Sequence, residues 1–384
     1  MRILVPLHSF EPGGSERVAL RLARAWRDSG HDVRIVLGRD EGPRPAFADG
    51  LDFEVLQRGS FSTAPFETLW MIAGLPARLR DFRPDLIFLP GNSYAVVGAV
   101  LKLLMGGACP PLVLKISNDL CRRDMPALGR AFYRLWCRLQ GCMLDRFIAL
   151  TPAMKRDVRR ALGVAHDSIA VIDNPVLSRA DADAIAALRR ATARPHAGRR
   201  FLAIGRLAPQ KNFALLLRAF ARIAGPEDRL AIVGEGGERL RLERLAKQLG
   251  IEDRLLMPGH IATPEAWLAG CDVFALSSDY EGLPAVVLEA LAAGLPVVAT
   301  DCSASMATLL ENGRLGRLVA PGDVEALAAA MDRPLVPDPA RSAAMAARFT
   351  VERAAPAYLR LFGALGSNAQ AQAQPGLGGA HVSR

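Results

Sequence analysis

Residues 272–300 read DVFALSSDYEGLPAVVLEALAAGLPVVAT, and the order of residue types in this stretch decides the fold class. The apolar run 272–276 predicts a buried strand, the polar residues after it a loop, and Pro284–Ala293 a helix. Pro284 suits the first helical position and Gly294 the end of the helix. The run 296–300 predicts the next strand, so the stretch is a strand-helix-strand unit of an α/β sheet.

Two glutamates occupy different positions in this unit, Glu281 in the loop and Glu289 inside the helix. Pro284 leaves the backbone amides of Gly282 and Leu283 near the positive end of the helix, where a diphosphate or a sugar hydroxyl can dock. Each glutamate alone is equally well explained as a cap or a solvated side chain. Together, a carboxylate before the helix and one inside it can bind different parts of one ligand.

The pattern of Glu, seven residues and Glu, set within Glu-Gly-Leu-Pro and Ala-Gly-Leu-Pro-Val-Val-Ala-Thr, resembles the retaining glycosyltransferases of family 4. That family has the GT-B fold, in which two Rossmann-like parallel-sheet domains face each other across a cleft. The resemblance implies that Glu281, with the amides of Gly282 and Leu283, binds the donor sugar. It implies that Glu289 binds the ribose hydroxyls of a nucleotide-diphosphate sugar.

The segment Gly205–Asn212, GRLAPQKN, resembles the Gly-Arg-Leu…Lys-Asn loop of the same family. The resemblance implies that Arg206 and Lys211 bind the donor diphosphate. Because a departing nucleoside diphosphate gains charge as the glycosidic bond breaks, two fixed cations can stabilise it where another fold would use Mg²⁺. Standing alone, the motif would be read as two exposed cations at a strand end. We therefore expect an enzyme that needs neither metal nor cofactor.

Weaker matches complete the expected site. Val233–Gly237 resembles the family's Val-Gly-Xxx-Gly loop, Pro258–Ile261 the strand end beside the nucleotide base, and Glu11–Arg17 the Gly-Gly-Xxx-Glu-Arg loop. The expected catalytic residues are Glu281, Arg206 and Lys211. The expected donor-binding residues are Gly13, Gly14, Asn118, Gly205, Gly234, His260, Ile261, Gly282, Leu283 and Glu289.

Asn118 departs from the family pattern. Many relatives carry a histidine that contacts the donor sugar at the place where this chain has Val113–Asp119, VLKISND. An amide can hydrogen-bond a sugar hydroxyl or carbonyl but cannot become a cation. Any role that requires an imidazolium is therefore absent at this position.

A strand-helix-strand pattern starts twice along the chain. The first has apolar runs at 2–7 and 31–37 around a helix-period stretch, and the second has runs at 200–205 and 229–234. Two parallel-sheet domains are therefore expected, with ligands at the carboxyl ends of the strands.

The expected division has an acceptor-binding domain and a nucleotide-sugar-binding domain. In chain order, we expect an N-terminal Rossmann-like domain at 1–175, a linker at 176–199, a C-terminal Rossmann-like domain at 200–350, a helix at 351–366 packing back towards the N-terminal domain, and a disordered tail at 367–384.

Composition and charge bound the function. The 384 residues are 51% hydrophobic and 23% charged, as in globular proteins, and carry a net charge of +9. Residues 121–160 hold ten Lys or Arg against three Asp, a local net charge of +7, which attracts polyanions. Without a groove-reading motif or an aromatic-rich single-strand platform, nucleic acid is not an expected partner.

The basic region has two open explanations. Arg130, Arg134 and Arg138 recur every four residues in a predicted helix that also carries aromatic and leucine residues. Such a helix can lie on an anionic membrane. It can equally pack through its aromatics and leave a solvated arginine face. The sequence shows no signal peptide and no uninterrupted transmembrane stretch, so we expect a cytoplasmic chain. If the first explanation of the basic region holds, the chain is peripheral on the inner face of the membrane. The six cysteines have no metal-finger spacing, so structural zinc is not expected.

The function expected from the resemblance is retaining transfer of a hexose or N-acetylhexosamine, with UDP favoured over GDP as the carrier. The acceptor would be a glycan or lipid-linked glycan of a cell-surface polysaccharide, lipopolysaccharide or glycolipid. A nucleotide-sugar epimerase of the same fold and a non-catalytic sugar-nucleotide-binding subunit remain alternatives.

Overall fold

The structure is a computed structural model. It describes residues 1–10, 14–57, 66–118, 120, 125–192, 196–261 and 263–373, with only the backbone of 366–373.

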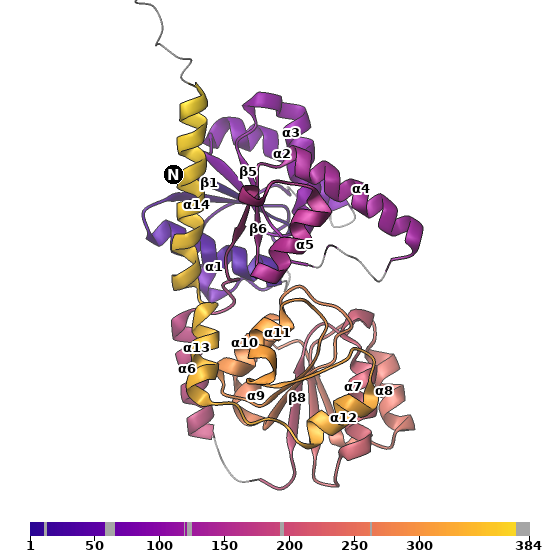
Figure 1. Cartoon of the computed structure of the whole chain (residues 1–384). Coiled ribbons are helices and arrows are strands. Elements are labelled where there is room, and N and C mark those ends of the chain that lie inside the picture. Colours follow the sequence, from indigo (N-terminus) through magenta and orange to yellow (C-terminus); the bar gives the residue numbers. More distant parts are fainter. Residues whose placement is uncertain are drawn as a thin grey trace, which may run out of the picture.

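The N-terminal half is a seven-stranded parallel sheet covered by helices (Figure 1). Its strand order is β3-β2-β1-β4-β5-β6-β7. The strands are almost continuously apolar because helices cover both faces of the sheet. The elements are β1 (Arg2–Leu7), α1 (Gly14–Asp28), β2 (Asp32–Leu37), β3 (Asp52–Val55), α2 (Glu67–Phe82), β4 (Leu86–Leu89), α3 (Ala95–Met105), β5 (Leu112–Lys115), α4 (Ala127–Met143), β6 (Arg146–Ala149), α5 (Pro152–Leu162) and β7 (Ile169–Val171).

The C-terminal half repeats this plan with six parallel strands in the order β10-β9-β8-β11-β12-β13. The chain order reverses at β8, which lies between β9 and β11, so the loops after these strands open where ligands of such sheets bind. The elements are β8 (Arg200–Ile204), α7 (Phe213–Ile223), β9 (Arg229–Val233), α8 (Arg239–Gln248), β10 (Leu255–Gly259), α9 (Glu265–Gly270), β11 (Val273–Leu276), α10 (Ala285–Ala292), β12 (Val297–Thr300), α11 (Met306–Leu309), β13 (Arg317–Val319), α12 (Val324–Asp332) and α13 (Pro339–Arg348).

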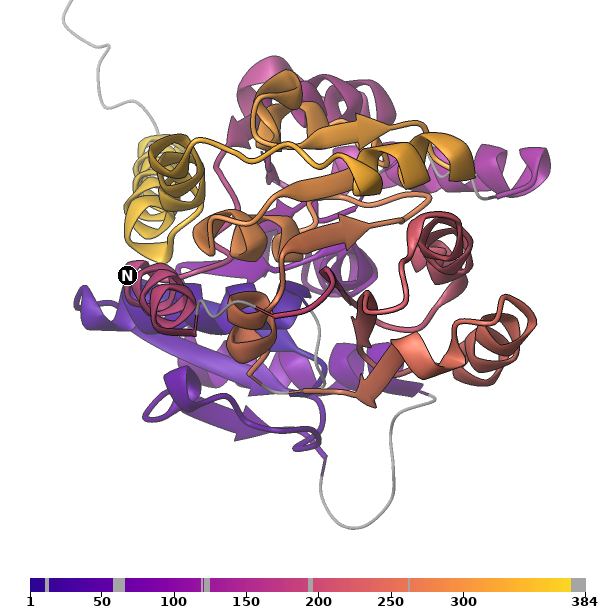
Figure 2. The same cartoon turned by 90° about the horizontal axis from the view of Figure 1, so that it is seen from below.

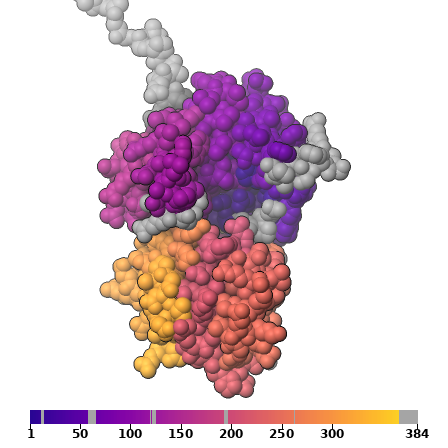
Figure 3. Space-filling model, turned by 90° about the vertical axis from the view of Figure 1, so that its right-hand side faces the viewer, coloured from indigo at the N-terminus to yellow at the C-terminus, as the bar shows by residue number. Residues whose placement is uncertain are grey.

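The expected pair of parallel α/β sheets is therefore confirmed, and the two halves form two lobes of the surface (Figure 3). Seen from below, the C-terminal half lies in front of the N-terminal half (Figure 2). One helix begins later than expected. Pro284 is the N-cap of α10, in an extended conformation, and the helix starts at Ala285. The amides of Gly282 and Leu283 still precede the start of α10.

The segment expected as a linker is largely a helix. Arg179–Thr192 forms α6, which packs against α9, α10 and α13 of the C-terminal half. Alanine and arginine are strong helix formers, and Ile185 is fully buried in this packing, so most of the expected linker forms a helix.

The chain passes between the halves twice, and the two passages lie side by side. The amide of Val176 donates to the carbonyl of Phe349 at 2.9 Å, and that of Val351 to the carbonyl of Leu177 at 2.9 Å. An isolated bridge joins Leu177 to Thr350. The two segments between the domains therefore support each other.

The last helix, α14 (Val351–Ala373), returns to the N-terminal half and packs against α1 (Figure 1). Its Tyr358 and Phe362 lie 5.8 and 5.2 Å, ring centre to ring centre, from Trp26 of α1. The expectation of disorder from residue 367 is wrong for 367–373, whose backbone continues the helix. Alanine and glutamine extend an existing helix at little cost because nucleation has already been met. Residues 374–384 lie outside the described part.

Candidate functional site

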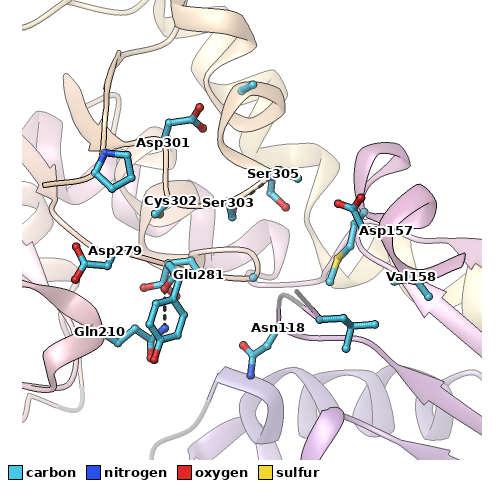
Figure 4. Close-up of a pocket in the computed structure, with 17 residues that line it drawn as sticks. Asn118, Asp157, Val158, Gln210, Asp279, Glu281, Asp301, Cys302, Ser303 and Ser305 are labelled. Carbon is cyan, nitrogen blue, oxygen red and sulfur yellow. Dashed lines mark hydrogen bonds between the residues drawn. The ribbon is translucent and has the colours of Figure 1, made fainter. Parts of the chain in front are cut away.

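A cavity of about 950 Å³ lies between the two halves (Figure 4). Its walls are segments that follow β5, β8, β11 and β12 at their carboxyl ends, together with α5. The lining residues are Asn118, Leu120, Met154, Asp157, Val158, Gln210, Asp279, Tyr280, Glu281, Gly282, Asp301, Cys302, Ser303, Ala304, Ser305, Ala307 and Pro321.

Glu281 and Lys211 form the central contact of this site. The Lys211 Nζ donates to Glu281 Oε1 at 2.5 Å, and the Ser278 hydroxyl donates to the same oxygen at 2.8 Å. The Lys211 and Glu281 side chains are only 17% and 11% exposed, so this ion pair is shielded from much of the solvent. Glu281 Oε2 accepts no hydrogen bond from the described part of the chain. The carboxylate is thus fixed through one oxygen, with the other left for a ligand.

The local fold of the β8 loop explains where Lys211 lies. Asn212 adopts a left-handed conformation with φ 43°, and its side chain caps α7 by accepting from the amide of Leu215. The same side chain donates to Asp279 Oδ1 at 2.8 Å. The Ser277 hydroxyl donates to the Lys211 carbonyl at 2.9 Å. These bonds join the loops after β8 and β11 and hold the lysine beside the glutamate.

Several of the supporting residues were missed by the sequence analysis. Ser278 positions Glu281, and the buried Thr300 hydroxyl donates to the Ser278 carbonyl at 2.5 Å. Gln210 donates through Nε2 to the Tyr280 carbonyl at 2.8 Å. The serine pair directly after an apolar strand was the only local signal, because the other partners are distant in sequence.

The glycine loops after β8, β9 and β10 lie together as expected. A Cβ on Gly234, whose φ is 150°, would lie 1.9 Å from the carbonyl oxygen of Gly205, so no side chain fits there. The Gly234 amide donates to the Gly259 carbonyl at 2.8 Å. His260 is exposed beside this junction, and Ile261 is half-buried against the core.

Arg206 follows Gly205 in the first of these loops and is exposed. Its side chain makes no hydrogen bond or ion pair with the described residues. Its guanidinium is therefore not committed to a protein carboxylate, unlike the ammonium of Lys211.

Glu289 is placed differently from Glu281. It lies on α10, is 8% exposed and is not among the residues that line the cavity. Burial raises the pKa of its carboxyl, while the positive charges of Arg17 and Arg21 act to lower it. The structure therefore does not bring the two glutamates into one cavity. It places Glu289 facing positive charge from α1 of the other half.

At Gly282 the backbones of the two halves approach each other closely. A Cβ on Gly282 would lie 1.9 Å from the carbonyl oxygen of Ser117 and 3.0 Å from the Cα of Asn118. Asn92 Oδ1 accepts from the amides of both residues, at 2.8 and 3.4 Å, which fixes their loop. The Asn118 side chain lines the cavity and has no hydrogen bond to the described residues. The neighbouring Leu283 is 9% exposed in the core, so its side chain supports the loop.

Of the glycine pair Gly13 and Gly14 in the first half, the structure describes Gly14. Gly14 is the first residue of α1, and a Cβ on it would meet no atom within 4 Å. Gly13 lies outside the described residues.

A buried lysine lies beneath the same edge of the N-terminal sheet and was also missed. Lys115, the last residue of β5, is 1% exposed and donates to Asn174 Oδ1 at 3.3 Å. Burial lowers the pKa of its ammonium group to about 7, against the opposing influence of Glu16. Asn174 belongs to the first passage between the halves, so this bond ties the passage to β5.

The basic helix is α4, and its outer surface is apolar as well as basic. Arg134 and Arg138 are exposed, Arg130 is half-buried, and Tyr133 and Trp136 pack on the core. A stripe of large apolar side chains at helical spacing is left exposed, namely Leu128 (71%), Phe132 (67%), Leu135 (59%) and Leu139 (46%). The explanation in which the helix buries its aromatic residues therefore accounts for Tyr133 and Trp136 but not for this stripe.

The described residues contain no group of three or more His, Cys, Asp or Glu side chains placed to hold a metal ion. None of their helices combines the length and the apolar character needed to cross a bilayer.

Both halves of the chain match family models. Residues 13–175 match the model described as glycosyl transferase 4-like domain, and residues 185–347 the one described as glycosyl transferases group 1. The chain is 26% identical to the lipopolysaccharide core biosynthesis glycosyltransferase LpsD of Rhizobium meliloti, covering 93% of this chain and 96% of LpsD. It is 27% identical to an uncharacterised glycosyltransferase of Haemophilus influenzae, covering 83% and 86%.

The fold is shared with solved structures. The crystal structure of Anabaena HepE in complex with UDP and glucose superposes with a TM-score of 0.72 at 25% identity, covering 94% of this chain and 99% of HepE. Together with the two parallel sheets, this likeness confirms the expected GT-B fold.

The fit of Gly282 against Ser117 gives a testable prediction. In Gly282→Ala the added Cβ would overlap a backbone oxygen, so the halves must separate, and the maximum dimension in small-angle X-ray scattering should increase. Gly237→Ala is the matched control, because a Cβ there meets nothing within 4 Å. Scattering curves that are identical for the two variants would contradict the contact.

Proposed function

This chain belongs to the glycosyltransferases that combine an N-terminal glycosyl transferase 4-like domain with a C-terminal domain of glycosyl transferases group 1, and on that premise we propose that it uses a nucleotide-diphosphate sugar as donor. In this proposal it transfers a hexose or N-acetylhexosamine, with retention of anomeric configuration, to a glycan or lipid-linked glycan. UDP is favoured over GDP because HepE, the solved likeness at 25% identity, was crystallised with UDP and glucose. Likeness to LpsD supports an acceptor in lipopolysaccharide or related cell-surface glycan synthesis.

The observation that carries the proposal is the shielded contact of Lys211 with Glu281 and Ser278 at the interdomain cavity. A cation held in a partly buried site stabilises charge that develops on a departing diphosphate more strongly than it would in water. Arg206, uncommitted to any described partner, supplies the second cation. Glu281, fixed through Oε1, offers Oε2 to a hydroxyl of the donor sugar.

The proposed chemistry needs no protein nucleophile. The acceptor oxygen attacks the anomeric carbon from the face that the diphosphate leaves, the bond from that carbon to the phosphate oxygen breaks, and the acceptor proton passes to a phosphate oxygen. Glu281 is a poor nucleophile because two donors already hold one of its oxygens. In this proposal Glu289, buried on α10 near the positive charges of Arg17 and Arg21, binds the ribose hydroxyls.

A donor panel tests the function. We expect nucleoside-diphosphate release from one UDP-sugar or GDP-sugar that depends on a candidate lipid-linked glycan acceptor. Donor conversion in the absence of any acceptor would instead support an epimerase. Tight donor binding without any turnover would support a non-catalytic subunit.

Lys211→Ala and Arg206→Ala should each reduce turnover at least about a hundredfold, since loss of one preorganised charge-stabilising group costs roughly 3–4 kcal/mol. Arg218→Ala, an exposed cation on α7, is the control and should keep wild-type turnover. Thermal melting checks that each variant is folded. Near-normal turnover in both site variants would remove the donor assignment.

Metal independence is part of the proposal. Because Arg206 and Lys211 take the part that Mg²⁺ or Mn²⁺ plays elsewhere, we expect turnover to be unchanged in excess EDTA. Abolition by EDTA with recovery on adding Mn²⁺ would show that the two cations do not suffice.

We also place the enzyme in the cytoplasm at the inner face of the cell membrane, where a lipid-linked acceptor would meet it. The exposed Leu128, Phe132, Leu135 and Leu139 of α4 can enter the headgroup region while Arg134 and Arg138 meet anionic lipid. Each basic residue near such a surface contributes about 1 kcal/mol to binding.

Vesicle co-sedimentation tests the surface of α4. The triple variant with Arg130, Arg134 and Arg138 changed to Glu, and separately Phe132→Ser with Leu135→Ser, should lose binding to anionic vesicles. The control changes Arg241, Arg244 and Lys247 of α8 to Glu, which alters the net charge equally on an exposed helix of the other half. Equal sedimentation of the wild type and the α4 variants would leave α4 with a structural role only.

A further inference from the structure

A second cavity, of about 530 Å³, lies at the amino ends of β8, β9 and β10. It lies on the face of the sheet where α9 packs beside β8 (Figure 1). The loops that form the interdomain site follow the carboxyl ends of strands in the same sheet, so the two cavities lie at opposite edges of it. They share no lining residue.

The floor of this second cavity is a row of apolar side chains that crosses three strands. Leu202 of β8 pairs with Ala231 of β9, which pairs with Leu256 of β10. Leu202 is 1% exposed, Ala231 is half-buried, and Leu256 is 52% exposed. Trp267 of α9, half-buried, forms a wall beside this apolar row. The row therefore begins under α9 and ends in an apolar surface that is open to solvent.

A row of three arginines lies next to the apolar row. Arg200 pairs with Arg229 across β8 and β9. Arg254 comes just before β10, whose first residue pairs with Leu230, so Arg254 lies beside Arg229. Each arginine precedes one member of the apolar row by two residues, and residues two apart along a strand point to the same face. All three arginines line the cavity, as this spacing requires.

The charges of the arginine row are not neutralised by the described residues. Arg229 and Arg254 donate only to backbone carbonyls there, at 2.9–3.2 Å. The exposed guanidinium of Arg200 has no hydrogen bond or ion pair with a described residue. The described lining includes one carboxylate, that of Asp253. Because like charges opposite each other on neighbouring strands destabilise a sheet, an anion beside the row would stabilise it.

The size of the cavity suits a small molecule with a chain. The apolar row crosses three strands, roughly 10 Å at a spacing of about 4.8 Å between neighbours, a length that a medium-chain acyl group can span. The volume of about 530 Å³ falls within the roughly 300–1,000 Å³ of small-molecule sites.

We propose that this cavity binds a medium-chain acyl anion, with its negative head group at Arg200 and Arg229 and its chain along the apolar row against Trp267. Charge complementarity sets the sign of the head group, and the adjacent open apolar surface sets the character of the rest of the ligand. The inference does not rest on the transferase function, because the two sites have no lining residue in common.

Octanoate and 1-octanol are the probes, because they have the same chain length and differ in the charge of the head group. Isothermal titration calorimetry of the full chain at low salt should show one saturable site for octanoate. We expect 1-octanol to bind about fivefold more weakly, the effect of losing one exposed ion pair. No donor is present in this experiment, so failure of the transferase function would not change its result.

Variants of the two rows have matched controls. Arg200→Gln should weaken octanoate binding about threefold, and addition of Arg229→Gln about tenfold in total. Leu256→Ser should weaken the binding of both probes about fivefold, because the chain loses apolar contact. Arg218→Gln on α7 and Leu240→Ser on α8 change exposed residues of the same types and should bind octanoate as the wild type does.

Two further variants locate the ligand. Ala231→Phe fills the cavity and should abolish octanoate binding, with thermal melting as the check that it is folded. If that variant does not fold, Leu256→Ser decides, since its side chain is half exposed. Phe132→Ser with Leu135→Ser alters the other basic and apolar surface, on α4, and should leave octanoate binding unchanged.

Four results would overturn the inference. They are absence of saturable octanoate binding to the wild type up to about 10 mM, equal affinity for the two probes, an octanoate Kd within twofold of wild type in the folded cavity variants, and loss of octanoate binding in the α4 variant.

Discussion

The site depends on one steric constraint, the approach of Gly282 to the carbonyl of Ser117 without room for a Cβ. Each sheet alone ends in open loops, and a ligand at either edge would face solvent on one side. Bringing the edges together encloses the cavity, lowers the effective dielectric around Glu281 and Lys211, and places Asn118 and Asp157 opposite the loops after β11 and β12. A side chain at residue 282 would keep these groups apart.

The two cations at the site are held differently by the protein. Lys211 is held by Glu281 and shielded, while Arg206 is exposed and uncommitted. A diphosphate that enters must therefore compete with a carboxylate for Lys211 but not for Arg206. In the proposed complex, Lys211 would contact the diphosphate and Glu281 would contact the donor sugar. The ion pair between the two side chains would therefore weaken when the donor binds.

The sequence could predict what is local or shared with a known family. The run 272–300 predicted β11, α10 and β12 closely, and the resemblance led to Glu281, Lys211 and Gly282, which the structure places at one site. The supports of Glu281 could not be predicted, because Thr300 and Asn212 reach it only through the fold. The wall formed by α5 was missed for the same reason. Residues 176–199 misled because alanine and arginine suit both an exposed linker and a packed helix.

The last helix joins the end of the chain to the N-terminal half. Tyr358 and Phe362 pack with Trp26 and Phe88, so α14 belongs by its contacts to the N-terminal half although it follows the C-terminal half in sequence. Between the lobes the chain consists of two short segments joined at Leu177 and Thr350. The Gly282 contact is a close fit between backbones and has no hydrogen bond or ion pair of its own in the described part. The halves are therefore held together elsewhere, by the paired segments at Leu177 and Thr350 and by the ion pair of Arg21 on α1 with Asp181 on α6.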